Sequence, residues 1–198
     1  MRRRTMTATC TALAATLLLA GCGGVSKGAG PTSTASDGPV VLAEVAAEFA
    51  GFGDQVKAVT YQEAVPAGAR VKVSVQAEGD TGTGFRLDLG GLTKGHAFGA
   101  HLHTKPCGAK PADAGPHYQD QADPTSPSTD PAYANDRNEV WLDFTADAEG
   151  NATVTRTVDF RPRQGEAGSI VIHAQHTATD HGKAGTAGDR WACVNLPL

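Results

Sequence analysis

The sequence predicts an all-β domain, a sandwich or barrel of short antiparallel strands. Glycine is abundant, with 24 residues in a chain of 198, and few segments place apolar residues at helical spacing. Several segments instead alternate apolar and polar residues with the period of two that a half-buried strand requires. Gly-rich and Asx-rich joints separate them at the short intervals that are typical of sandwiches and barrels.

Six segments carry the strand pattern and follow one another along the chain. Residues 69–76 and 85–89 alternate most cleanly. The series continues with residues 139–144, 152–160, 169–174 and 191–196. Residues 42–49 fit either a short helix or a strand, whereas residues 104–138 lack strand character and are rich in Pro, Asp, Ser and Ala. Structureless stretches of that length in compact domains tend to be functional or disordered.

The N-terminus resembles the export signal of bacterial lipoproteins. Three arginines precede an uncharged run from Thr5 to Gly21, whose apolar centre is too short to span a bilayer. The run ends in Leu-Ala-Gly-Cys at residues 19–22, which resembles the lipobox in which the cysteine is diacylated and becomes the first residue. We therefore expect residues 1–22 to be a signal peptide and Cys22 to carry a lipid anchor at the outer face of the cell membrane. The alternative is an ordinary signal peptide with an incidental cysteine.

The rest of the chain divides into a tether and one domain. Residues 23–38 consist largely of Gly, Ser, Thr, Ala and Pro, a composition typical of a flexible tether. Residues 39–198 fit one domain of ordinary size. The expected signal peptide removes three of 17 basic residues and none of 21 acidic ones, so the exported protein has a net charge of −7. Such an acidic protein is not expected to bind nucleic acid, and nothing in the sequence indicates an oligomeric state.

Cysteine usage agrees with export. Of the four cysteines, Cys10 lies in the expected signal peptide and Cys22 is the lipid candidate, which leaves Cys107 and Cys193. An exported domain with two cysteines most simply forms one disulfide. This disulfide would close a loop of roughly 87 residues. Two free thiols are the alternative, which fits an oxidising compartment less well.

The histidines are the candidate metal ligands, and all of them follow residue 95. They are His96, His101, His103, His117, His173, His176 and His181. On a strand, His101 and His103 lie on one face while Leu102 points the other way into a core. Two imidazoles one strand period apart suit a transition metal such as copper. Exposed histidine pairs are also common on strand faces, so this spacing alone does not decide the function.

Five sequence elements together resemble the copper/zinc superoxide dismutase family, in the family's order. Residues 91–103 resemble the strand in which a Gly-Leu approach leads into HGFHxH, and Cys107 follows. Residues 114–117 resemble the AGPHF segment, and residues 168–173 resemble the strand that ends in the fourth copper ligand. Residues 185–193 closely resemble GNAGSRxAC. The resemblance implies the immunoglobulin-like superoxide dismutase fold, a Greek-key β-barrel of about eight strands.

The resemblance also implies roles for single residues. It implies four copper ligands, namely His101, His103, His117 and His173. It implies that Arg190 guides the superoxide anion, for which its permanent charge and planar fork of donors are suited. It implies a Cys107–Cys193 disulfide that ties the ligand loop to the last strand. In the family, the residue corresponding to His117 bridges copper and zinc and supplies a proton. Because the net charge repels superoxide at long range, we expect copper, Arg190 and Lys183 to provide local positive charge.

The zinc site of the family lacks its histidines here. No histidine lies between His117 and Asn138. The acidic residues of this stretch are Asp120, Asp123, Asp130 and Asp136. Carboxylates without imidazole or thiolate are unusual ligands for a structural zinc. We therefore predict copper as the cofactor, no zinc, and His117 as a terminal copper ligand whose role in proton supply is open.

Two spacings also depart from the family. His96 and His101 are two residues further apart than in HGFHxH, which predicts a bulge before the ligand pair and a hydrogen-bonded structural role for His96. The segment between His173 and Arg190 is shorter than the family's electrostatic loop, which predicts a more open copper site. Asp180 is a candidate to orient a ligand histidine. The remaining histidines of this segment receive no role.

Two functions of different classes follow from these observations. The first is a copper-dependent superoxide dismutase, which converts superoxide to oxygen and hydrogen peroxide outside the cytoplasm. The second is an extracytoplasmic copper-binding or storage protein with the same fold and little turnover. Arg190 favours the enzyme, because a copper store needs no site for a small anion. The missing zinc ligands and the short loop favour the binding protein.

Overall fold

The computed structural model describes residues 38–198, which form one compact unit. The predicted signal peptide, the predicted lipid site at Cys22 and the tether up to Asp37 lie outside the described residues. Within residues 38–198, no helix has the length and apolar character needed to cross a membrane.

The described chain consists of nine strands and one short 3-10 helix. The strands are β1 (Val41–Ala50), β2 (Ala58–Thr60), β3 (Arg70–Glu78), β4 (Gly82–Gly90), β5 (Ala97–His103), β6 (Phe144–Thr145), β7 (Ala152–Val158), β8 (Ser169–His173) and β9 (Arg190–Asn195), and the helix is η1 (Pro111–Ala114). The prediction of an all-β fold is therefore confirmed, with nine strands in place of about eight.

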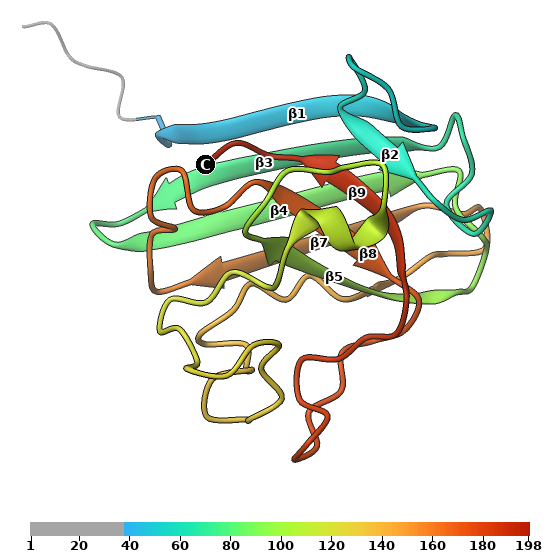
Figure 1. The fold of residues 1–198 in the computed structure, drawn as a ribbon. Helices are drawn as coiled ribbons and strands as arrows, with labels where there is room; N and C mark the ends of the chain where they lie inside the picture. Colours follow the sequence, from blue (N-terminus) through green and yellow to red (C-terminus); the bar gives the residue numbers. More distant parts are fainter. Residues whose placement is uncertain (1–37) are drawn as a thin grey trace, which may run out of the picture. The chain divides into compact units, whose positions relative to one another are not determined.

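The strands form one curled sheet in the order β6-β5-β8-β9-β2-β1-β3-β4-β7 (Figure 1). The two end strands of this order, β6 and β7, also contact each other, so the sheet is nearly closed into a barrel. All pairings are antiparallel except one. The short strand β2 runs parallel to the end of β1, where Phe49 pairs with Ala58, so the prediction of purely antiparallel strands is wrong at this one place.

The structure decides one segment that the sequence left open and corrects one predicted strand. Residues 42–49 lie in strand β1, in which Val45 and Ala47 pack against the core and Glu44 and Glu48 are exposed. The predicted strand at 139–144 is mostly wrong, because only its last residue lies in β6. Trp141 makes an isolated bridge to His101, and the rest of the segment runs beside β5 without a continuous ladder.

Strand β5 separates the barrel core from the histidines. Leu102 is fully buried in the core cluster, as predicted from the alternation. His101 and His103 lie on the opposite face, yet they too are fully buried. Chain segments outside the barrel must therefore cover this face of β5.

The predicted bulge before the ligand pair is absent. Strand β5 keeps a continuous register with β6 and β8 from Ala97 to His103. The irregularity lies elsewhere, between Ile172 and His173 in the pairing of β8 with β9. The longer spacing between His96 and His101 is regular strand, because residues 97–100 all pair in β5.

The long loop between β5 and β6 is held near its start and near its middle. As predicted, residues 104–138 contain no strand, and their one helical turn is η1. The predicted disulfide is confirmed: Cys107 is bonded to Cys193 of β9, with the two Cα atoms 5.7 Å apart. Further along, Arg163 donates to the carbonyls of Gln119 and Asp120 at 3.0 and 2.9 Å. These contacts fix the loop against the barrel and so position His117.

Candidate metal centre

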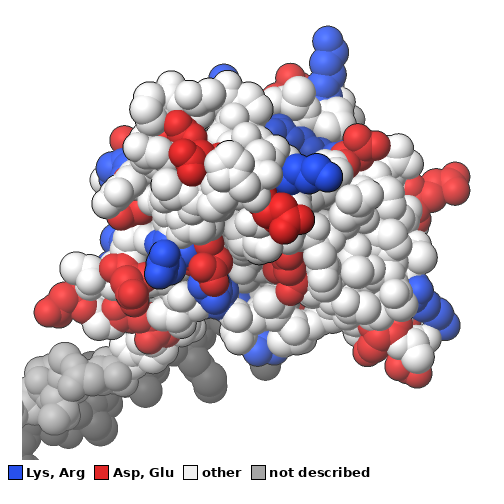
Figure 2. All heavy atoms as spheres, turned by 90° about the horizontal axis from the view of Figure 1, so that it is seen from below, with Lys and Arg blue, Asp and Glu red and all other residues white. Residues whose placement is uncertain are grey.

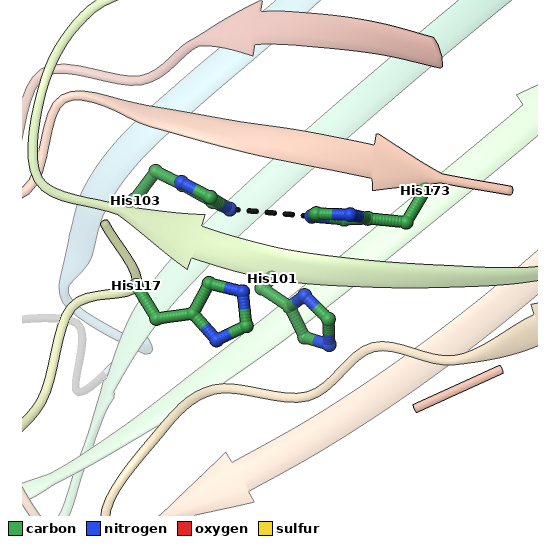
Figure 3. A group of neighbouring side chains, drawn as sticks. All are labelled: His101, His103, His117 and His173. Carbon is green, nitrogen blue, oxygen red and sulfur yellow. Dashed lines mark hydrogen bonds between the residues drawn. The ribbon is translucent and has the colours of Figure 1, made fainter. Parts of the chain in front are cut away.

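Four histidines converge on one point beside strand β5. His101 and His103 come from β5, His117 from the long loop and His173 from the end of β8 (Figure 3). Each offers one ring nitrogen, and these four nitrogens lie within 4.8 Å of one another. In residues 38–198, this is the one group of three or more possible metal ligands that meets in this way. The structure thus brings together all four predicted ligands.

Three of the histidines have their Nδ1 atoms held by oxygen acceptors. Nδ1 of His103 donates to the carbonyl of Gly115 at 2.9 Å, and Nδ1 of His117 donates to the Glu139 carboxylate at 2.8 Å. Nδ1 of His173 lies 3.4 Å from the carbonyl of Gly188. Carbonyl and carboxylate oxygens only accept, so the proton of each neutral ring sits on Nδ1. The Nε2 lone pairs of these rings are therefore free for a metal.

His101 is held in the opposite sense. Its Nε2 donates to the Thr177 hydroxyl at 2.6 Å. That hydroxyl in turn donates to the Asp143 carboxylate at 2.7 Å, and the same carboxylate accepts the Thr177 amide at 2.7 Å. The proton of His101 therefore sits on Nε2, and Nδ1 carries the lone pair. This Nδ1 is buried and has no hydrogen-bond partner in the described chain.

The electrostatics of the cluster fit a bound cation. Burial and then the neighbouring histidines hold the pKa of His101 well below its usual range, and the pKa of His103 likewise. Burial, followed by His117, lowers the pKa of His173 to about 3. Nε2 of His103 lies 3.3 Å from Nε2 of His173 (Figure 3, dashed line), and in neutral rings both atoms carry lone pairs. A metal ion relieves this repulsion and also gives the orphaned Nδ1 of His101 a partner, so the residues present fit a metal with imidazole ligands.

Glu139 is a site residue that the sequence analysis missed. Its side chain is buried, with the residue 1% exposed, and it accepts from His117, from Nε1 of Trp141 at 2.7 Å and from Nε2 of Gln119 at 2.8 Å. Glu139 and Asp143 stand four positions apart in a segment predicted as a strand, where alternate residues share a face. Two acids on one face of an otherwise apolar strand were the available signal of a site there. The sequence around Thr177 gave no such signal.

The acidic residues of the long loop serve local structure. The Asp123 carboxylate accepts from the Ser128 hydroxyl at 2.5 Å, and Asp130 accepts the Ala132 amide at 2.9 Å. Asp136 forms an ion pair with Arg156 at 2.8 Å. Asp120 lies 3.7 Å from Arg163, and none of the four joins the histidine cluster. Nδ1 of His117, the nitrogen that could bind a second metal, donates its proton to Glu139 instead. The absence of zinc stays a prediction.

The metal centre opens into a cleft of about 620 Å³. His117, His173 and Arg190 all line it. Arg190 is half-buried, and its Nη1 donates to the carbonyl of Pro111 in η1 at 3.2 Å. Burial lowers the pKa of Arg190. The face formed by the loops is the lower side of Figure 1, and Figure 2 shows that acidic and basic side chains are interspersed on it.

Several other predicted residues lie away from the centre. Asp180, His181 and Lys183 are exposed, and Lys183 does not line the cleft. The acid that orients a ligand histidine is Asp143, acting through Thr177, rather than Asp180.

The two other histidines make structural contacts. His96 donates from Nε2 to the carbonyl of Ala174 at 2.9 Å and packs between Phe98 and Trp191, which agrees with its predicted structural role. His176 donates from Nε2 to the carbonyl of Phe144 at 3.1 Å.

Fold and site together define an all-β barrel protein with one disulfide and a cluster of four histidines that could hold a metal ion. The family model of copper/zinc superoxide dismutase matches residues 68–196. The chain therefore belongs to the copper/zinc superoxide dismutase family, as the sequence motifs predicted.

Comparisons beyond the family are distant. No curated protein matches the chain significantly. Among solved structures, the clock protein EA4 is 19% identical, with 75% of this chain and 98% of that chain covered and a TM-score of 0.49. A double mutant of a SOD-like protein from Bacillus subtilis is 18% identical, with coverages of 64% and 88% and a TM-score of 0.44. A single mutant of that protein is 16% identical, with coverages of 65% and 90% and a TM-score of 0.46.

Proposed function

We propose that this protein is a copper-dependent superoxide dismutase. The observation that carries the proposal is the convergence of four imidazole lone pairs, each oriented by a separate hydrogen bond, beside a cleft that also contains Arg190. Imidazole ligands suit both oxidation states of copper. Copper bound there would supply one-electron chemistry: it would take an electron from one superoxide, which leaves as oxygen, and give it to a second, which takes up two protons and leaves as hydrogen peroxide.

The protein's own residues bind the substrate and orient the ligands. Arg190 receives the superoxide anion in the cleft, and the Pro111 carbonyl keeps its guanidinium in place. Glu139 holds the proton on Nδ1 of His117 and fixes the plane of that ring. Thr177 does the same for Nε2 of His101. Because Glu139 engages its Nδ1 proton, His117 would bind copper through Nε2 alone, and the protons for hydrogen peroxide would enter from solvent through the cleft.

We also propose that the protein is exported and held by a lipid at Cys22 on the outer face of the cell membrane. The lipobox-like sequence supports this location, and so does the disulfide, since disulfides persist in oxidising compartments. Expression of the full chain with metabolic lipid labelling tests it. We expect label in the membrane fraction and its loss in Cys22→Ala. A membrane-bound, labelled Cys22→Ala protein would disprove the anchor.

A copper-binding protein with little turnover is the second candidate. The loop from His117 to Asn138 has no histidine to hold a second metal, and the histidine cluster alone suffices for binding copper. This candidate gives Arg190 no role at the copper.

One experiment separates the two candidates. The purified chain is loaded with Cu(II), and copper content and superoxide dismutation are measured for wild type, His173→Ala, Arg190→Ala and Lys94→Ala. The enzyme requires that His173→Ala lose copper and activity, and that Arg190→Ala keep copper but lose most activity. Lys94→Ala is the matched control, because Lys94 is exposed and lies outside the cleft. Tight copper binding with the dismutation rate of the metal-free protein would establish the binding protein instead.

A further inference from the structure

The cleft is much larger than superoxide requires. A water molecule takes up about 30 Å³ of liquid volume, and a diatomic anion is of similar size. The cleft encloses about 620 Å³, which lies within the range of roughly 300–1,000 Å³ that is typical of small-molecule sites. It extends from the metal centre past Pro116 and along the loop segment that contains Ser126 and Thr129. It therefore has room for an organic molecule.

Four of the charged residues in the cleft wall are already engaged. Glu166 pairs with Arg163 at 2.7 Å, and Arg163 also holds the long loop. The Glu139 carboxylate accepts three hydrogen bonds. The Asp123 carboxylate accepts from the Ser128 hydroxyl and from the backbone. These groups have few free donors or lone pairs to offer a ligand.

Two cations in the same wall have no acidic partner among residues 38–198. They are Lys105, which follows β5, and Arg190, which begins β9. Arg190 is half-buried, and its one hydrogen bond goes to the Pro111 carbonyl. A partly desolvated guanidinium without an anion is unfavourable, and its planar donors match carboxylate and phosphate oxygens. A cleft of this volume with two unpaired cations is complementary to a ligand that carries two anionic groups.

We propose that this cleft binds a small organic anion with two or more acidic groups, one on Arg190 and one on Lys105. Carboxylates and phosphates share this oxyanion chemistry. The body of the ligand lies against Pro116, and the hydroxyls of Ser126 and Thr129 supply further hydrogen bonds. Because His117 and His173 line the same cleft, the bound anion lies across the approach to the metal centre. If the protein is the proposed superoxide dismutase, on which this point rests, such an anion competes with superoxide.

Calorimetric titration of the full chain, purified without added metal, tests the proposal. The probes are acetate, the dicarboxylates from malonate to adipate, and pyrophosphate. We expect saturable binding of at least one dianion at millimolar concentrations or below, with acetate at least about tenfold weaker, because one charge-assisted contact is worth about 1.5 kcal/mol or more. The two probe classes distinguish a carboxylate site from a phosphate site.

The matched variants are Lys105→Gln, Arg190→Gln and Lys94→Gln, of which Lys94 is exposed and lies outside the cleft. Each of the first two weakens binding of the dianion about tenfold or more, while Lys94→Gln leaves the affinity unchanged. Equal weakening by all three variants, an unaffected Lys105→Gln protein, or no saturable binding by wild type would overturn the proposal. Circular dichroism confirms that each variant is folded. Because binding is measured without metal, its failure is distinct from a failure of dismutation.

Discussion

The most informative single perturbation is removal of the Glu139 carboxylate. This buried group accepts hydrogen bonds from His117, Trp141 and Gln119. In Glu139→Ala these donors lose their acceptor, and the His117 ring loses the contact that fixes its tautomer. The isosteric Glu139→Gln keeps one acceptor oxygen but places an amide where a carboxylate oxygen stood. We expect both variants to be less stable and to bind copper less tightly, with the alanine variant the more affected.

The expected magnitudes follow from burial. Three donors lose their acceptor, and each buried donor that is left unsatisfied costs about 1–3 kcal/mol because it stays desolvated. Gln119 and Trp141 are only half-buried and regain some water contact, so we expect the lower end, about 3 kcal/mol. For a domain of this size each 1 kcal/mol lowers Tm by about 2–4 °C, which predicts a loss of about 6–12 °C. Loss of an outer partner of a metal-binding histidine typically weakens metal binding about 10- to 100-fold.

The assay combines thermal unfolding of the metal-free protein with Cu(II) competition against a chelator. Glu166→Ala is the control, since Glu166 lines the same cleft but its carboxylate is 55% exposed in an ion pair with Arg163. Exposed pairs are worth about 1 kcal/mol or less, so this variant should unfold and bind copper nearly as wild type does. If Glu139→Ala bound copper as tightly as wild type, Glu139 would not be orienting a ligand. Equal effects of Glu139→Ala and Glu166→Ala would show that the loss of any carboxylate near the cleft weakens copper binding and lowers stability.

Three further predictions concern the other contacts of the centre. Thr177→Val removes the acceptor of Nε2 of His101 and should weaken Cu(II) binding about tenfold in the chelator competition, with Thr177→Ser close to wild type. Replacing Cys107 and Cys193 together by alanine should lower the free energy of unfolding in urea by about 4 kcal/mol, because the disulfide closes a loop of 86 positions. The third prediction concerns pH. His173 has a folded-state pKa of about 3, so between roughly pH 6.5 and 3 the unfolded chain binds the extra proton, and the metal-free protein should lose up to about 1.4 kcal/mol per unit of acidification from this residue.

Each of these predictions has an outcome that would contradict it. Equal copper affinities of the valine and serine variants at Thr177 would show that the hydroxyl does not determine the ligand nitrogen. If dithiothreitol left the urea midpoint of the wild-type protein unchanged, the disulfide would not contribute to stability. For the pH dependence, His173→Gln should flatten the dependence of unfolding free energy on pH, and an unchanged slope in that variant would refute the assignment.

The sequence by itself determined the fold class, the disulfide and the identity of the four clustered histidines. Strand signals are local: clean alternation placed β3 and β4, and further strand-like segments between turn residues placed β7, β8 and β9, all to within a few residues. The His-Leu-His spacing placed two imidazoles on one face because strand geometry has a period of two. Motif order did the rest, since residues 91–103, 168–173 and 185–193 carry recognisable residues at close spacing.

Only the tertiary structure decided how the histidines are held and what surrounds them. The partners of His101 and His117 come from distant positions, such as Thr177, 76 residues after His101 in the chain, and no local pattern couples such positions. Glu139 and Asp143 gave a local signal, two acids on one face of a predicted strand, but their partners His117 and Thr177 lie at distant positions that no local pattern indicates. Hydrogen-bond direction then assigns the proton on each ring. That assignment depends on which acceptor the fold brings within about 3 Å, a property of packing that exists only once the chain has closed around the site.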